Sequence, residues 1–179
     1  TYTGKHFSGW SLSSTGSVKY TDEQSVNNLT SENNGTITLY AIWSDNSYKV
    51  KFDANGGSGT MTDQSFTYGT VQKLTKNSFT YTGYDFAGWK DKNGVTYTDE
   101  QSVSNLTSEN NGIITIYAQW TPHKYTIKYD GNGATSGSTA NSSHTYDKSN
   151  TLTKNGYNRT GYDFAGWNRS SDGTGTSYK

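Results

Sequence analysis

The fold is decided by residues 48–120, which run from YKVKFDANGG (48–57) through TGYDFAGW (82–89) to IITIYAQW (113–120). Most of the remaining chain repeats parts of this stretch. TGYDFAGW returns unchanged at 160–167 and in the looser form TGKHFSGW at 3–10. Because a fixed repeat period is the signature of an array of structural units, the sequence predicts several small domains instead of one larger fold.

Two short polar segments divide the copies. SDNS (44–47) follows the end of one predicted strand, and TPHK (121–124) follows the end of its second copy. Such segments between one strand and the next are typical of linkers. We therefore expect the C-terminal part of a repeat at 1–43, a complete repeat at 48–120 and the N-terminal part of a repeat at 125–179.

Alternating side chains predict half-buried strands. Residues 48–53 alternate apolar side chains with lysine or aspartate, and residues 36–43 and 113–120 each have one apolar face. Residues 22–29 (DEQSVNNL) are expected to form a short helix with Asp22 as the N-cap, and the matching segment DEQSVSNL (99–106) is expected to form a turn or a short helix. The expected fold class is α+β and β-rich: tandem small β-grasp-like domains with mostly antiparallel sheets and at most a short helix each.

The composition predicts aromatic cores. The chain has 15 Tyr, 5 Trp and 6 Phe residues, and its aliphatic content is low. A buried aromatic side chain removes roughly 150–250 Å² from water, so a few rings can supply most of a small core. We expect six rings to form this structural core motif: Phe52, Phe86, Trp89, Trp120, Trp43 and Trp167.

The charge and the cysteine count exclude several classes of protein. The 15 basic residues balance the 15 acidic ones without a basic stripe, which argues against a nucleic-acid partner. No apolar run approaches the roughly 20 residues of a membrane-spanning helix, so no membrane insertion is expected. The chain has no cysteine, whereas secreted eukaryotic arrays of small domains usually carry disulfides. The Ser-, Thr-, Asn- and Tyr-rich composition favours an extracellular location on a bacterial surface over the cytosol.

No motif for catalysis or metal binding emerges. His6, His123 and His144 are far apart and lack the spacing of metal ligands. DGNGA (130–134) opens like a calcium loop, but neither its fifth nor its twelfth position carries a suitable ligand. We therefore expect no enzymatic activity, and no catalytic, metal-binding or cofactor-binding residue.

The motifs, taken in order, resemble the Listeria–Bacteroides repeat, a relative of the internalin B-repeats. The most specific of them are FDANGG (52–57), TGYDFAGW (82–89 and 160–167) and YAQW (117–120). The resemblance covers essentially the whole chain. It implies a β-grasp-like module, strung in tandem in large bacterial surface proteins between a ligand-binding head and a cell-wall anchor. It supplies no catalytic residues.

Two functions remain open. The first is a non-enzymatic stalk or spacer in a secreted bacterial surface protein or adhesin, whose partners are the neighbouring repeats. The alternative is a module that binds carbohydrates or host proteins through exposed tyrosines, for which Tyr40, Tyr97 and Tyr117 are the candidates. Because partial repeats expose sheet edges that invite pairing, we also expect 125–179 of one copy to associate head to tail with 1–43 of the next.

Overall fold

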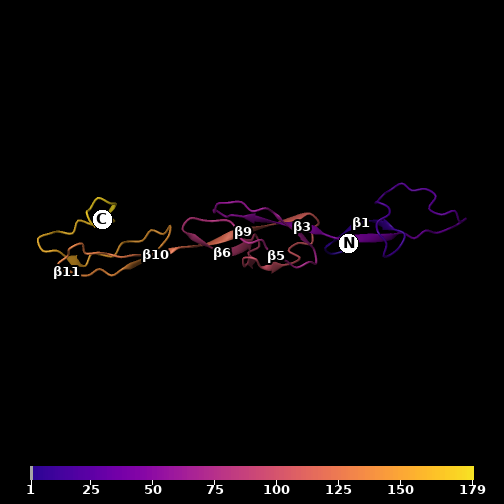
Figure 1. The fold of residues 1–179 in the computed structure, drawn as a ribbon. Coiled ribbons are helices and arrows are strands. Elements are labelled where there is room, and N and C mark those ends of the chain that lie inside the picture. Colours follow the sequence, from indigo (N-terminus) through magenta and orange to yellow (C-terminus); the bar gives the residue numbers. More distant parts are fainter. Residues whose placement is uncertain (1) are drawn as a thin grey trace. The chain divides into compact units, whose positions relative to one another are not determined.

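Strands alone make up the regular structure. The computed structural model describes residues 2–179, which form fifteen strands and no helix (Figure 1). These residues divide into two compact units, the first comprising residues 2–82 and 86–120, the second residues 83–85 and 121–179. The prediction of a β-rich chain is confirmed, while the short helix of the α+β class is absent from the described residues.

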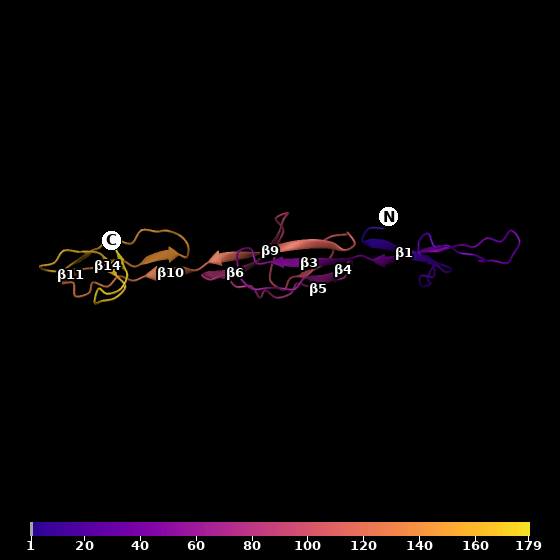
Figure 2. The ribbon, with the colours of Figure 1, turned by 90° about the horizontal axis from the view of Figure 1, so that it is seen from above.

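A five-stranded sheet forms the centre of the first unit. Its strand order is β4-β3-β9-β6-β7, and its strands are β3 (Ser47–Asp53), β4 (Gln64–Thr67), β6 (Tyr84–Asp91), β7 (Thr96–Tyr97) and β9 (Gly112–Pro122). β3 pairs with β4, and β6 with β7, in antiparallel fashion. β3 and β9 lie side by side and run parallel (Figure 2), with Val50 opposite Ile114 and Phe52 opposite Ile116. A parallel pair requires a long crossover, here residues 54–111, so the predominantly antiparallel chain has one parallel pair at the centre of its largest sheet.

The core of the first unit is built around Trp89. Its side chain is fully buried, and its ring lies against Phe52, Phe79 and Phe86 at centroid distances of 5.1, 6.1 and 4.9 Å. All these ring pairs are tilted or edge-on, the arrangements that aromatic quadrupoles favour. The indole Nε1 has no hydrogen-bond partner, so Trp89 contributes to the core as an apolar ring.

The alternation along β3 determines which face packs on this core. Tyr48, Val50 and Phe52 are buried, while Lys49 and Lys51 point to solvent, as the period of two predicts. On the neighbouring strand β9, Ile116 and Ala118 are completely buried. The two parallel strands therefore present one continuous apolar surface to the rings.

The short helix expected at 22–29 is wrong, and of the two alternatives at 99–106 the turn is confirmed. Glu23 and Asn28 in the first copy, and Glu100 and Asn105 in the second, have φ values between 51° and 56°, which an α-helix cannot contain. A side-chain hydrogen bond from Thr98 N to Gln101 Oε1 (2.8 Å) closes a turn instead. The chain then continues as β8 (Ser102–Val103), which pairs with β5 (Gln72–Lys73).

The beginning of the first unit holds a separate antiparallel pair. β1 (Lys5–Ser11) pairs with β2 (Tyr40–Asp45) through a bulge between Phe7 and Gly9. Trp43, expected in the core, is 39% exposed. The prediction fails because β2 pairs with β1 alone, whereas β9, its counterpart, is covered on both edges.

The second unit contains three small antiparallel pairs. They are β10 (Lys124–Ile127) with β12 (Ser142–Thr145), β11 (Ser136–Gly137) with β13 (Tyr157–Asn158), and β14 (Trp167–Asn168) with β15 (Ser177–Tyr178). Tyr129 is buried against the half-buried ring of Trp167 at a centroid distance of 4.6 Å. This pair repeats the contact between Phe52 and Trp89 in the first unit.

Candidate functional site

The three tyrosines proposed for ligand binding differ in exposure. Tyr40 on β2 is 41% exposed, and Tyr117 on β9 is half-buried. Tyr97 is only 8% exposed, so its assignment to the surface is wrong. Tyr97 lies opposite Trp89 in the β6–β7 pair, and its hydroxyl donates a hydrogen bond to Asp91 Oδ2 (3.3 Å). The structure therefore does not bring the three side chains together into one site.

The burial of Tyr97 gives a testable pH dependence. Burial raises the pKa of its hydroxyl, and the charge of Asp91 raises the pKa further. The folded chain therefore binds this proton more tightly than the unfolded chain does, and the resulting stability is complete below about pH 10 and is lost as the pH rises through the folded pKa. We expect the free energy of unfolding to fall more steeply above about pH 10 in the wild type than in Tyr97→Phe. Denaturant titrations at each pH measure this, and equal slopes would contradict it.

The described residues show no metal centre and no membrane-spanning helix. Within residues 2–179, no group of three or more His, Cys, Asp or Glu side chains could hold a metal ion. No helix in the same range is long and apolar enough to cross a membrane. The organised polar contacts are instead found where one copy of the repeat sequence meets the next.

Asn46 is the centre of the first of these contacts. Its backbone N–H donates to Gly4 O and its backbone oxygen accepts from Tyr68 N, both at 2.8 Å. Its side-chain oxygen lies 2.9 Å from His6 Nδ1, and its side-chain nitrogen donates to Ser108 O at 2.6 Å. Asn46 is only 5% exposed, so one buried residue with all its polar groups bonded connects the first copy to the second.

A glycine allows the two copies to approach closely at this point. Gly4 has a φ of 71°, and the ring of Tyr68 lies against it so closely that a Cβ atom would be 2.1 Å from Tyr68 Cδ1. A side chain at this position is therefore excluded by both sterics and backbone conformation. Only Asn46 separates the end of β2 from the start of β3. We call Gly4, Asn46 and Tyr68 the first junction.

The backbone hydrogen bonds and the glycine–tyrosine contact of this arrangement recur within the second unit, although His123, which takes the place of Asn46, is exposed. Gly83 O accepts a hydrogen bond from His123 N, and His123 O accepts one from Tyr146 N, both at 2.8 Å. The ring of Tyr146 lies against Gly83, whose φ is 82°. His123 Nε2 is 3.1 Å from Asp85 Oδ1. Neither of these two junctions was predicted from the sequence, although a signal was present: a Thr-Gly pair lies about forty residues before each short polar segment, and a Thr-Tyr pair lies about twenty residues after it.

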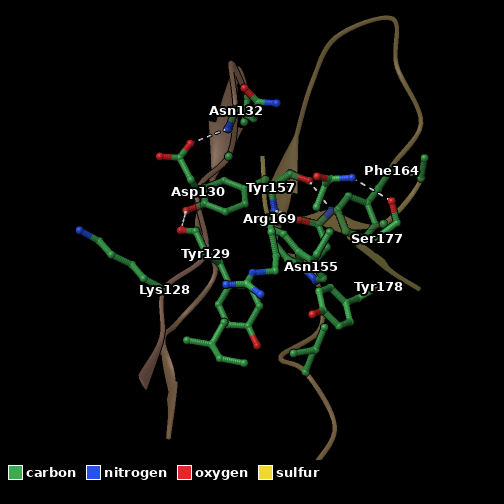
Figure 3. Close-up of a pocket in the computed structure, with 18 of the residues that line it drawn as sticks. Lys128, Tyr129, Asp130, Asn132, Asn155, Tyr157, Phe164, Arg169, Ser177 and Tyr178 are labelled. Carbon is green, nitrogen blue, oxygen red and sulfur yellow. Dashed lines mark hydrogen bonds between the residues drawn. The ribbon is translucent and has the colours of Figure 1, made fainter. Parts of the chain in front are cut away.

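A groove of about 1630 Å³ opens in the second unit. Figure 3 shows Lys128, Tyr129 and Asp130 along one side and Phe164, Ser177 and Tyr178 along the other. Its lining is predominantly aromatic and polar. Its two walls are the regions that contain β10 and β14.

One wall of the groove is fixed by the hydroxyl of Tyr129. This oxygen accepts a hydrogen bond from Thr153 N and shares one with Ser142 Oγ, both at 2.8 Å. Burial opposes ionisation, but these hydrogen bonds outweigh it, so the pKa of Tyr129 lies below its usual value. Tyr129 is thus positioned at both its ring and its hydroxyl.

A β-rich chain built from copies of one repeat sequence defines the class of this protein. The sequence profile of the Listeria-Bacteroides repeat domain matches residues 1–42, 48–119 and 125–179. The chain therefore belongs to the Listeria-Bacteroides repeat domain family, and the expected relationship is confirmed.

The similar proteins include ones from two bacteria. A protein of Evansella cellulosilytica named "Putative membrane protein" is 32% identical over 151 residues, which is 80% of this chain and 21% of that protein. Internalin H of Listeria monocytogenes is 36% identical over 121 residues, 66% of this chain and 19% of internalin H. The chain thus spans about a fifth of the length of these relatives. No solved structure matches it significantly.

Proposed function

We propose that this chain is a non-enzymatic stalk or spacer segment of a secreted bacterial surface protein, located outside the cell. The relatives support this setting, since one is named a membrane protein and another an internalin. In this function each repeat buries its own aromatic core, and the number of repeats determines how far a distal part of the protein extends.

The first junction is the observation that carries the proposal. A spacer requires connections that resist bending, and a flexible linker does not provide this. At the first junction, strand follows strand with one residue between them, and that residue is buried with every polar group bonded. The ion pair between Lys5 and Asp45 adds a contact beside it.

The sheet of the middle copy supports the β-grasp-like part of the proposal. The strands β4-β3-β9-β6 form a mixed sheet whose two central strands are parallel, and a β-grasp-like sheet has such a centre. The recurrence of the junction contacts in both units supports a tandem arrangement of such modules in a longer protein.

The experiment that tests the stalk function measures rigidity at the first junction. The chain has no cysteine, so Thr15→Cys and Ser65→Cys provide unique sites for spin labels on exposed positions of the two copies. We expect a narrow distribution of the distance between the two spin labels when the rest of the chain is wild type. Gly4→Ala should broaden it, because the new methyl group overlaps Tyr68.

Gly161→Ala is the matched control. Gly161 also has a positive φ, 79°, but nothing lies within 4 Å of its missing Cβ. This variant shares the backbone strain of Gly4→Ala without the overlap, and the distribution should stay narrow. A broad distribution in the wild-type junction, or no effect of Gly4→Ala, would contradict the stalk function.

The alternative, binding of carbohydrate or host protein, has less support. Exposed tyrosine rings can stack on sugars, but of the three candidates only Tyr40 is well exposed, and Tyr97 is buried. A glycan array probed with Tyr40→Ala beside the wild type would test it. Equal binding, or none, would leave no role for this residue.

A further inference from the structure

A buried histidine of the second unit occupies the position of a core phenylalanine. His144 lies opposite Tyr125 in the β10–β12 pair, just as Phe66 lies opposite Tyr48 in the β3–β4 pair. His144 is 4% exposed and Phe66 is 2% exposed, and each ring stacks on the tyrosine opposite it. An ionisable ring therefore stands in the second unit where the middle copy has an apolar one.

The ring of His144 ends a chain of hydrogen bonds. Thr153 N donates to the hydroxyl oxygen of Tyr129 at 2.8 Å. That oxygen lies 2.8 Å from Ser142 Oγ, which in turn lies 2.8 Å from His144 Nε2. We call Tyr129, Ser142 and His144 the relay. The middle copy has phenylalanine at the positions of both Tyr129 and His144, so the relay is particular to the second unit.

The amide of Thr153 determines the direction of every hydrogen bond in the relay. An N–H group can only donate, so the hydroxyl oxygen of Tyr129 is the acceptor. Tyr129 is only 6% exposed, so its own O–H needs an acceptor inside the protein, which is Ser142 Oγ. The Ser142 O–H then donates to His144 Nε2. His144 is therefore neutral and carries its proton on Nδ1.

A second proton on His144 is incompatible with this pattern. It places an N–H group against Ser142 Oγ, which already accepts from Tyr129, so the Ser142 O–H loses its acceptor. It also places a positive charge at a buried position, which is costly unless an opposite charge is close. Within residues 2–179, no ion pair includes His144.

The neighbouring segments supply no compensating charge to His144. The group that contacts its ring from β10 is the uncharged phenol of Tyr125, at a centroid distance of 5.4 Å. Asp147 accepts a hydrogen bond from Tyr84 instead. The charged side chains of the adjoining segments are all exposed: Lys124, Lys128, Asp130, Asp147, Lys148 and Lys154.

We propose that the second unit is an acid-sensitive element of the spacer, stable with neutral His144 and loosened when His144 takes up a second proton. A histidine that is buried in its neutral form must become charged as a protein unfolds in acid. In an unfolded chain this proton binds near about pH 6.5. The stability that the relay contributes is therefore complete above this pH and is lost as the pH falls. The middle copy has Phe66 instead, so mild acid loosens one copy and leaves the other folded.

Nuclear magnetic resonance of the full chain with isotope-labelled histidine tests the tautomer directly. At about pH 8, where histidine is ordinarily neutral, Nδ1 of His144 should carry a proton and Nε2 should carry none. The exposed His123 provides a reference in the same spectrum. A proton on Nε2 of His144 would reverse the direction of the relay and overturn the inference.

Urea unfolding at about pH 8 and about pH 5.5, followed through the backbone amide signals, tests the sensitivity to acid. The ratio of folded to unfolded molecules reported by β10 and β12 should fall by up to about tenfold per pH unit below about pH 6.5. The ratio reported by β3 and β4 should change much less. His144→Phe, which introduces the residue of the middle copy, should remove the difference. His123→Gln, the matched control at an exposed histidine, should keep it.

Tyr129→Phe provides a second test if His144→Phe does not keep the wild-type circular dichroism spectrum. Without the phenol hydroxyl, Ser142 Oγ no longer has to accept from Tyr129, so both tautomers of His144 should be populated. Equal acid sensitivity of the two strand pairs, or of His144→Phe and the wild type, would overturn the inference. Since the stalk function rests on the first junction and not on the relay, such a result would leave that function untouched.

Discussion

Trp89→Ala is expected to lower the free energy of unfolding of the middle copy by about 3–5 kcal/mol. The indole is fully buried among three phenylalanine rings, so its removal leaves a large cavity in a small core. Small domains are stable by only about 5–15 kcal/mol in total. The variant should therefore be partly or completely unfolded, as measured by denaturant titration followed by near-ultraviolet circular dichroism.

Trp43→Ala is the matched control for this prediction. Trp43 is the same residue type, in the strand β2 that corresponds to β9, but it is 39% exposed. Replacing it should lower the free energy of unfolding by about 1 kcal/mol or less, as is usual for exposed positions. If Trp89→Ala lowered the free energy of unfolding no more than Trp43→Ala does, the stability of the core would not depend on the buried indole.

The second large effect is expected in forced unfolding of the middle copy. β3 and β9 are parallel and paired over six residue pairs, from Tyr48 with Gly112 to Asp53 with Tyr117. Tension applied between the beginning of β3 and the end of β9 pulls these strands in opposite directions. All the pairs then resist together, so the copy should unfold at a high force.

Two attachment geometries separate this effect from overall stability. Handles at Ser47→Cys and Gln119→Cys slide the strands along each other. Handles at Ser47→Cys and Glu109→Cys pull on the same end of both strands, so the pairs open one after another. We expect a markedly higher unfolding force in the first geometry, measured by single-molecule force spectroscopy. Equal forces would show that the parallel pair does not resist tension.

The local parts of this fold could be predicted from the sequence. Alternation along residues 48–53 identified β3 and its buried face, because a strand repeats every two residues. The lack of aliphatic residues identified the aromatic core around Trp89. Both features depend on residues that are close in the sequence or on the overall composition, and both of these can be seen without knowing the fold.

The failures concern contacts between distant segments and special backbone conformations. The parallel pairing of β3 with β9 joins residues more than sixty positions apart, and alternation does not specify a partner. The DEQSV turns depend on left-handed residues such as Glu100, for which the sequence gives no local signal. Trp43 is exposed because β2 has a neighbouring strand on one edge only. The sequence of a strand does not specify how many neighbours it has, so this exposure was not predicted.

The functional site was predictable only in part. Asn46 and His123, around which the junctions are built, lie in the two short polar segments that were predicted to separate the copies. The junctions were missed because their glycine and tyrosine are about sixty residues apart and meet only after folding. Tyr97 was assigned to the surface since a two-residue strand gives too short a pattern to determine which side chain turns inward.

The junctions also bear on how such a gene can grow or shrink. One side-chain pair differs between the junctions, His6 with Asn46 at the first and Asp85 with His123 at the second. Each pair lies within one copy and the polar segment that follows it, and Asn46 also donates a hydrogen bond to Ser108 O in the following copy. The contacts between one copy and the next include a glycine that packs against a tyrosine ring and two backbone hydrogen bonds. These contacts are the same at both junctions. A recombination event that duplicates or deletes a whole copy therefore carries each variable pair along intact and recreates the shared contact. The length of the array can therefore change while the shared backbone and glycine–tyrosine contacts are kept.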